Sequence, residues 1–168
     1  MTNGDALRRL TKNAMLTTIA LTIFTLEAQI PLPIPIPGVK LGLANIVTVY
    51  AMFALTPADA IAILLCRVTL GAIFAGQMMS FFYSLCGGLL CYLTMLLVRP
   101  IMSEGQIPIC SILGAVAHNV GQIIAAIIVT KTLSIVSYLP FLLISGIVSG
   151  AFTGLCAYFV TRRMKPKQ

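Results

Sequence analysis

The stretch QIPLPIPIPGVKLGLANI occupies residues 29–46 and has four prolines, at every second position from Pro31 to Pro37. Each proline removes an N–H group and clashes with the preceding turn, so the proline-containing part cannot be helical. Alternating prolines also remove the hydrogen-bond donors from one whole edge of an extended chain. Backbone without partners cannot face lipid. We therefore predict that residues 30–40 form a stiff apolar external loop, either a lid over a cavity or a plain interfacial linker, whose lid residues are Pro33, Pro35, Pro37 and Gly38.

The composition around this loop is that of a membrane protein. Of the 168 residues, 59% are hydrophobic and only 9% are charged, and the mean hydropathy is +1.03. A soluble domain has roughly 25% charged residues, so this chain cannot cover a water-facing surface. We predict one domain over residues 1–168, an all-α polytopic integral membrane protein of the cell membrane.

The apolar residues on both sides of the loop divide into six segments. Local signals mark the breaks: TPAD at residues 56–59 has a capping residue, a proline at the first helical position and a capping-box acid. RPIMSEGQIP at residues 99–108 mixes charge, glycine and proline, which is typical of a loop. The predicted transmembrane helices cover residues 13–29, 41–55, 58–75, 78–98, 109–130 and 138–161.

The basic residues give this six-helix model its orientation. With six spans, eight of the eleven Lys and Arg residues fall on the side of the two termini, two fall on the opposite side, and Arg67 lies within a span. Cytoplasmic loops are enriched in Lys and Arg, so both termini are predicted to be cytoplasmic. The net charge of +7 is therefore explained without nucleic acid, and attraction to anionic membrane lipids is a secondary expectation. The eight are Arg8, Arg9, Lys12, Arg99, Arg162, Arg163, Lys165 and Lys167.

The fifth segment contains the densest polar group, in GAVAHNVGQ at residues 114–122. His118 and Gln122 are one helical turn apart, and Asn119 adjoins them. We predict that the three residues form one polar wedge near the middle of the membrane. Interhelical hydrogen bonding is the simpler explanation, and ligand binding is the one favoured by three such residues within five positions.

Arg67 lies near the middle of the third segment, where an arginine needs a partner, a cavity or an anion. An ion pair with Glu27 and contact with a substrate anion are equally good explanations. Asp59 precedes Arg67 by eight residues, about 12 Å along a helix, and is expected to cap its own helix instead.

Further candidate ligand-binding residues lie at the outer rim. Glu27 ends the first segment, Lys40 is flanked by Gly38 and Gly42, and Asn45 lies inside the second segment. Lys40 either meets an anionic group entering from outside or simply extends to the interface. Asn45 is expected to face protein or ligand, not lipid.

Small residues recur at four-residue spacing in two segments, which favours close helix packing. In the last segment they are Gly146, Gly150 and Gly154, and we expect these to pack inside this chain. In the first segment Ala14 and Thr18 have the same spacing, and there internal packing and partner docking are equally open.

Several kinds of chemistry have no motif here. The sequence has no Walker A loop, no paired carboxylates for magnesium, one histidine, and five cysteines without a metal-binding pattern. We therefore expect no catalytic residues, no metal and no cofactor, and a protein that binds and moves a molecule.

With its six short segments, basic N-terminus and proline-rich first loop, the chain resembles the substrate-binding (S) components of energy-coupling-factor (ECF) transporters. PIPGVKLGLANIVTVYAMF at residues 35–53 is similar to the Gx transporter family, which is also labelled heptaprenyl diphosphate synthase component I. The resemblance implies a subunit that binds a vitamin-like small molecule under the first loop. It also implies docking through small residues of the first helix, here Ala14 and Thr18, onto a transmembrane coupling subunit joined to two ATPases. The usual docking pattern has alanine at both positions, and this chain has threonine at the second.

Three functions remain at this point. The first is an S subunit of an ECF-type transporter, with a quinone, isoprenoid or flavin-related cargo suggested by the family label. The second is a non-transport accessory membrane subunit of isoprenoid or quinone biosynthesis or of extracellular electron transfer. The third and least favoured is an enzyme in which Arg67 and Lys40 hold a prenyl diphosphate.

Overall fold

The computed structural model describes residues 3–30, 40, 42–76 and 78–164. The predicted lid residues Pro33, Pro35, Pro37 and Gly38 lie outside this part of the chain. The described residues form helices and no strand: α1 (Asn3–Glu27), α2 (Asn45–Ala54), α3 (Pro57–Ala75), α4 (Met78–Val98), α5 (Ile107–Thr130) and α6 (Leu139–Met164), with the short 3-10 helices η1 (Arg99–Ile101), η2 (Glu104–Gln106) and η3 (Leu133–Tyr138).

The all-α prediction is confirmed, and each of the six predicted segments corresponds to one helix. Within the described residues, four helical stretches are long and apolar enough to cross a membrane: Pro57–Ala75, Met78–Ile101, Glu104–Thr130 and Leu133–Met164. The chain is thus a membrane protein by length and composition. Helix α2 has only 10 residues, and α1 begins at Asn3, so it includes the basic residues that were expected to precede it.

Helix α3 begins where its sequence signals predict. The Thr56 hydroxyl accepts a hydrogen bond from the Asp59 N–H at 3.2 Å, and the Asp59 carboxylate accepts one from the Thr56 N–H at 3.4 Å. These reciprocal bonds form a capping box, with Pro57 at the first turn. Asp59 also accepts from Arg9 Nε at 2.6 Å and from Asn13 Nδ2 at 2.7 Å. One carboxylate therefore caps α3 and ties it to α1.

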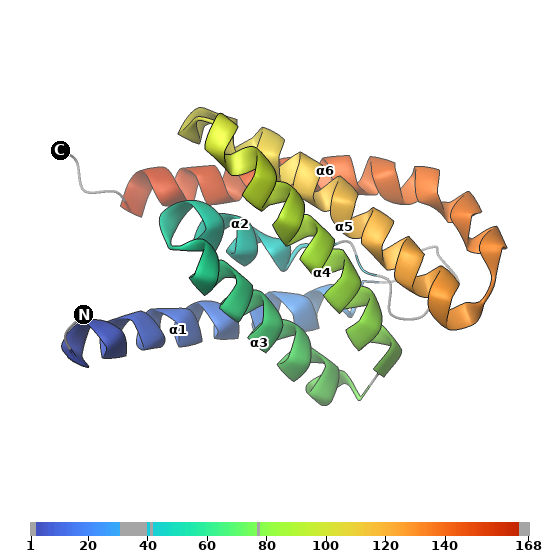
Figure 1. Ribbon diagram of the computed structural model, residues 1–168, viewed down its shortest axis with the longest axis horizontal. Helices are drawn as coiled ribbons and strands as arrows, with labels where there is room; N and C mark the ends of the chain where they lie inside the picture. The colour runs from blue at the N-terminus through green and yellow to red at the C-terminus, as the bar shows by residue number, and fades with distance from the viewer. Residues whose placement is uncertain (1–2, 31–39, 41, 77, 165–168) are drawn as a thin grey trace.

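Helices α5 and α6 are neighbours (Figure 1), and their backbones are almost in contact at two glycines of α6. A Cβ atom on Gly154 would lie 2.6 Å from the Pro108 Cα, and one on Gly150 would lie 2.8 Å from the Ile112 Cα. Between them the hydroxyls of Ser111 and Thr153 are hydrogen-bonded at 3.0 Å. The prediction that the glycine face of the last helix packs inside this chain is confirmed.

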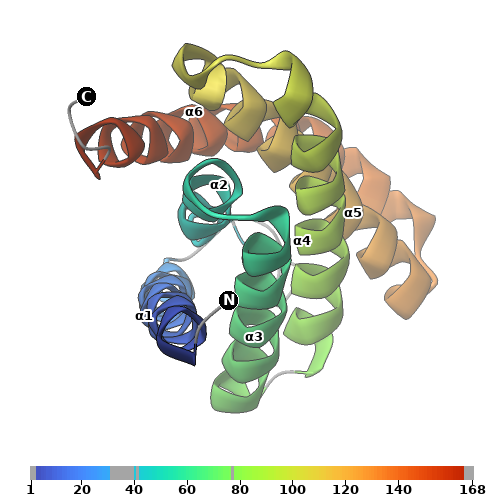
Figure 2. The same ribbon diagram turned by 60° about the vertical axis from the view of Figure 1, so that its left-hand side comes forward.

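Helix α2 is the shortest of the six and the most central. It contacts each of the other five helices, and Figure 2 shows it enclosed between α1, α3 and α6. Its Val49, Ala51 and Met52 are at most 1% exposed. Polar side chains on α2 are thus held in the interior.

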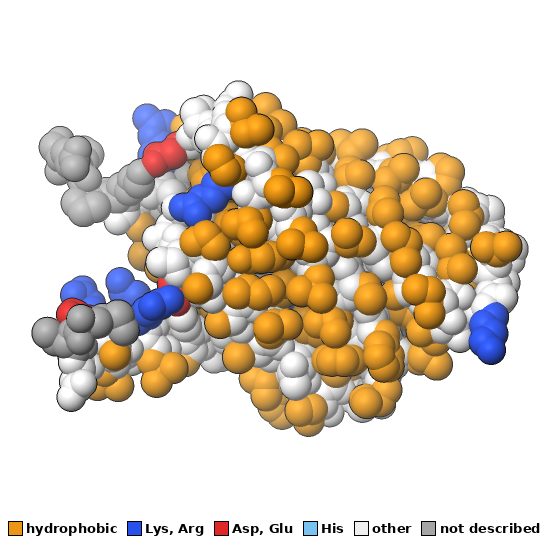
Figure 3. Space-filling view, viewed as in Figure 1, with side chains coloured by type: hydrophobic (Ala, Val, Ile, Leu, Met, Phe, Trp, Pro, Cys, Tyr) orange, Lys and Arg blue, Asp and Glu red, His pale blue; other side chains and the backbone are white. Residues whose placement is uncertain are grey.

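The outer surface is apolar around the middle, and its charged side chains gather mainly at one end. Large side chains such as Ile73, Phe74 and Leu97 are between 68% and 74% exposed. Figure 3 shows this apolar face between one end where Lys and Arg gather beside the two termini and an opposite end with little charge. Such a surface suits contact with lipid tails, with the charged end in a headgroup layer.

Candidate functional site

Five buried polar residues from four helices converge in the interior and form what we call the polar cluster. Glu27 ends α1, Asn45 begins α2, Arg67 lies within α3, and His118 and Gln122 lie one turn apart on α5. Each is at most 5% exposed. All five were predicted from the sequence as ligand-binding candidates, and the fold brings them together.

Glu27 fixes the entry to α2. Its carboxylate accepts hydrogen bonds from the backbone N–H groups of Gly42 at 2.5 Å and Ala44 at 3.3 Å. Gly42 has a φ of +82°, which other residues adopt only with strain. The last residue of α1 thereby sets where Gly42 and Asn45 lie.

Arg67 reaches Asn45. Its Nη2 donates to the Asn45 Oδ1 at 3.2 Å. Glu27 and Arg67 attract each other electrostatically, but the Glu27 carboxylate is hydrogen-bonded to the backbone of Gly42 and Ala44. Asp59 caps its own helix, as predicted, and the direct partner of Arg67 is an amide.

His118 and Gln122 face α4 across a glycine. A Cβ on Gly87 would lie 2.8 Å from the His118 carbonyl oxygen, 3.0 Å from its Cε1 and 3.0 Å from the Gln122 Cγ. A Cβ on Gly42 would lie 3.2 Å from the His118 Cδ2 and 2.9 Å from the Asn45 Nδ2. The imidazole is thus fitted between Gly42 and Gly87, and both glycines belong to the shape of the site.

Five polar atoms of the cluster have no hydrogen-bond partner among the described residues. They are the Asn45 Nδ2, the Arg67 Nε, the His118 Nδ1 and both amide atoms of Gln122. Leaving a buried donor or acceptor unsatisfied costs about 1–3 kcal/mol. Five such atoms in one place are more than a fold retains for packing alone, so the cluster is suited to bind a molecule with both donors and acceptors.

Asn119 does not join its two neighbours. Its Nδ2 donates to the Leu142 carbonyl oxygen at 2.5 Å, and a Cβ on Gly146 would lie at the same distance from this Nδ2. Asn119 therefore faces α6, while His118 and Gln122 face α4. The three residues therefore do not form the single wedge that was predicted. Asn119 joins α5 to α6 through a hydrogen bond, and His118 and Gln122 belong to the polar cluster.

Lys40 lies beside the cluster, half-buried over an aromatic ring. Its Nζ is 3.3 Å from the ring centroid of Phe24 on α1, which is a cation–π geometry. Burial lowers the pKa of Lys40 from 10.5 to about 8, and the charge of Glu27 partly opposes that shift. Lys40 is thus a contact residue of α1 and not simply an interfacial lysine.

The predicted docking residues lie on the outside. Ala14 and Thr18 are exposed on α1, and the Thr18 hydroxyl donates to the Ala14 carbonyl oxygen at 3.0 Å. Thr22, one turn on, does the same with the Thr18 carbonyl oxygen at 3.0 Å. Because these hydroxyls are satisfied within the helix, this face presents small side chains without unsatisfied donors.

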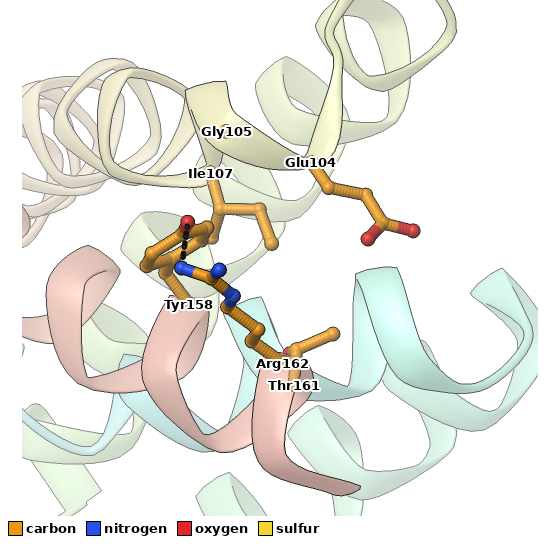
Figure 4. A pocket seen from close by; sticks show the side chains of 6 residues that line it. All are labelled: Glu104, Gly105, Ile107, Tyr158, Thr161 and Arg162. Atoms are coloured by element: carbon orange, nitrogen blue, oxygen red, sulfur yellow. Dashed lines mark hydrogen bonds between the residues drawn. The ribbon is translucent and has the colours of Figure 1, made fainter. Parts of the chain in front are cut away.

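A separate hollow lies near the C-terminal end of α6, shown in Figure 4. It has a volume of about 140 Å³ and is lined by Glu104, Gly105, Ile107, Tyr158, Thr161 and Arg162. Arg162 Nη1 donates to the Tyr158 hydroxyl at 3.3 Å. Its residues come from two segments far apart in the chain, so no sequence pattern predicts this hollow.

One member of the site had no distinguishing sequence signal. Gly87 is followed by a second glycine, Gly88, but a Cβ on Gly88 would meet Leu64 and not the cluster. Thr48, one turn after Asn45 on α2, is a further buried polar residue that was not predicted: it is 2% exposed, and its hydroxyl has no partner in the described part of the chain. Threonine is common in membrane helices, so the sequence does not distinguish it. A search of the described residues finds no group of three His, Cys, Asp or Glu side chains that could hold a metal.

No curated protein and no solved structure matches this chain. A family model does match, over residues 16–160, which include α2 to α5, most of α6, the second half of α1 and every residue of the polar cluster. The chain therefore belongs to the family described as heptaprenyl diphosphate synthase component I.

Proposed function

We propose that this protein is the membrane-embedded substrate-binding subunit of an ECF-type transporter, and that the polar cluster binds its small-molecule cargo. The observation that carries the proposal is the group of buried polar atoms without a partner among the described residues, on Asn45, Arg67, His118 and Gln122, which the fold brings together. A ligand that satisfies these atoms would recover part of the free energy that their burial costs.

The cluster also limits what the cargo can be. It offers one guanidinium, one carboxylate already engaged with Gly42 and Ala44, and neutral amide and imidazole groups. Arg67 and Lys40 carry two positive charges and the Glu27 carboxylate opposes one of them, so the site would not neutralise a dianion or a diphosphate. The cargo that fits is neutral or singly anionic, with hydrogen-bonding groups on an apolar body, as in a quinone precursor, a flavin-related molecule or another vitamin-like compound.

In this proposal the membrane is crossed six times and both termini are cytoplasmic. A helix of 25 residues such as α1 is about 37 Å long, enough to cross a hydrocarbon core of about 30 Å. Helix α2, with 10 residues, is about 15 Å long, so by itself it covers about half of one of these six crossings. Because Glu27 ends α1 and Asn45 begins α2, the cluster lies in the outer half, beneath the loop of residues 30–40 that would act as its lid.

The energy for transport would come from other subunits. The chain has no ATP-binding motif, so we propose that it is not an enzyme and that it docks onto a coupling subunit carrying two ATPases. The exposed face of α1 around Ala14 and Thr18 is the proposed docking surface, because its small side chains permit a close approach of another helix.

The proposal is tested by purifying the tagged protein and identifying what accompanies it. We expect a coupling subunit with its ATPases to copurify and mass spectrometry to detect a bound small molecule. Gln122→Leu removes two unpartnered polar atoms at nearly constant volume and should abolish ligand retention. Thr153→Val makes a comparable change at the α5–α6 contact, outside the cluster, and should leave retention unchanged. Absence of both ligand and ATPases would refute the proposal.

A second function is favoured by the family description, which calls the family a synthase component. In that case the chain would be a non-catalytic membrane subunit for a prenyl diphosphate synthase, and the cluster would contact an isoprenoid or quinone headgroup. Copurification of a synthase without ATPases would select this function. Loss of synthase activity in Arg67→Gln, with the complex intact, would point to the enzymatic role that we favour least.

A further inference from the structure

A second hollow lies at the end of the molecule that carries the termini, far along α1 from the polar cluster. Its volume is about 170 Å³, and its lining is Asp5, Arg8, Arg9, Lys12, Asn13 and Leu55. We call it the basic hollow. It lies between the first turns of α1 and the junction of α2 with α3, and the proposed transport function does not use it.

The charges of the basic hollow favour an anion. Arg9 is engaged with the neighbouring carboxylate of Asp59 at 2.6 Å and with the Thr56 hydroxyl at 3.3 Å. Arg8 and Lys12 are four residues apart and therefore share a face of α1. Even with both nearby carboxylates, Asp5 and Asp59, counted against the three cations, the hollow has an excess of positive charge.

Asn13 adds a hydrogen-bond acceptor. Its Nδ2 donates to Asp59 at 2.7 Å, which directs its Oδ1 elsewhere, and this buried Oδ1 has no partner. Cations beside an unsatisfied acceptor suit a ligand that combines a phosphate with a hydroxyl group.

The position of the hollow on α1 selects a lipid as the source of that phosphate. If α1 crosses the membrane, its length of about 37 Å exceeds the hydrocarbon thickness of about 30 Å, so its first turns lie among the headgroups. There Leu7 and Leu10 are 65% and 66% exposed, and they lie on a different face from Arg8 and Lys12. Exposed leucines on one side and cations on the other are typical of a helix segment at the membrane interface.

We propose that the basic hollow binds the headgroup of an anionic phospholipid from the leaflet on the side of the termini. Arg8 and Lys12 donate to the phosphate, and the Asn13 Oδ1 accepts a hydrogen bond from a headgroup hydroxyl. Leu55 provides the apolar contact. A lipid held here lies at the joint between α1, α2 and α3, beside the capping box of α3.

The test compares lipid retention by the whole protein in nanodiscs and after extraction, with native mass spectrometry as the readout. Nanodiscs contain phosphatidylglycerol, which has both a phosphate and hydroxyls, mixed with phosphatidylcholine. We expect wild-type protein to retain phosphatidylglycerol, and Arg8→Gln with Lys12→Gln to weaken its binding about 30-fold, the factor expected from two interfacial cations. Asn13→Leu should reduce the preference for phosphatidylglycerol over phosphatidic acid, which lacks the headgroup hydroxyls.

A matched control separates the hollow from general surface charge. Arg99→Gln with Arg163→Gln removes the same charge outside the basic hollow and should leave retention unchanged. Equal weakening by both pairs would overturn the proposal. It would also fail if inorganic phosphate bound the detergent-solubilised protein while no lipid was retained. If the variant with Arg8→Gln and Lys12→Gln does not fold, a second variant with Arg8→Lys and Lys12→Arg keeps the charge. This variant should retain the lipid. Loss of the lipid from the folded second variant would count against the site.

Discussion

Two adjacent glycines on α4 allow the geometry of the polar cluster to be tested with a single chemical change. Gly87→Ala and Gly88→Ala each add one methyl group to the same helix. At Gly87 the new Cβ would lie 2.8 Å from the His118 carbonyl oxygen, and at Gly88 it would lie 2.8 Å from the Leu64 Cδ1. The nearest distances are equal, but the atoms that must yield are different.

The backbone of α5 cannot shift to relieve such a clash, whereas a leucine side chain can rotate. A Cβ on Gly121 would lie 2.8 Å from the Cys86 carbonyl oxygen, so α4 and α5 are already in close contact here. Overpacking of this kind costs about 1–3 kcal/mol, and alanine gains about 1 kcal/mol over glycine in a helix. Subtracting this gain from the overpacking cost leaves a loss of stability of about 0–2 kcal/mol. We expect the free energy of unfolding of Gly87→Ala to fall by about 1–2 kcal/mol, in the upper part of this range, because the clash is with a backbone atom. For Gly88→Ala we expect a change near zero, because Leu64 can change rotamer for about 1 kcal/mol.

The unfolding midpoint in detergent, followed by the reaction of a dye with the buried thiols of Cys91 and Cys110, measures this difference. A loss of 1–2 kcal/mol corresponds to a midpoint about 2–8 °C lower for a chain of this size. Gly87→Ala should also reduce ligand retention, since it displaces His118 and Gln122. Equal midpoints for the two variants would refute the packing argument.

Three further predictions concern the start of α3, the pKa of Lys40 and the loop of residues 30–40. Asp59→Asn should destabilise the fold by about 1–2 kcal/mol, because the cap of α3 weakens and the ion pair with Arg9 is lost; the unfolding midpoint measures this, and an unchanged midpoint would contradict it. The pKa of Lys40 is lowered from 10.5 to about 8 in the folded protein. Between these two pH values the unfolded chain binds more protons than the folded one, so the free energy of unfolding should rise as the pH increases from 8 to 10.5. This rise should disappear in Lys40→Met, and titrations of the two proteins that coincide would exclude Lys40 as its source. Replacing Pro33 and Pro35 with alanine should shorten ligand retention more than it lowers the unfolding midpoint if residues 30–40 are a lid, whereas unchanged retention would leave them a linker.

Local signals in the sequence were sufficient to predict most of the helices. The capping box at Thr56 and Asp59 depends on residues three apart, so its geometry follows from the chain itself. The glycine spacing of α6 likewise predicts a face that can approach another helix closely. Charge distribution did not predict where α1 begins, because Arg8, Arg9 and Lys12 are compatible with a helix that extends into the headgroup layer.

The candidate site was predicted residue by residue, but its connections were not. The sequence identified Glu27, Asn45, Arg67, His118 and Gln122 as polar groups that lipid cannot accommodate. It did not show that Arg67 would donate to Asn45 instead of pairing with Glu27, because these residues belong to three helices whose relative positions depend on packing.

What the sequence determined by itself is the all-α membrane character, the helix starts with capping signals, and the identity of the buried polar residues. These follow from composition and from interactions within one or two turns. Only the tertiary structure decided that His118 and Asn119, adjacent in the chain, serve different neighbours. Successive residues of a helix point about 100° apart, so their roles depend on which helix lies on each side, here α4 with Gly87 and α6 with Gly146.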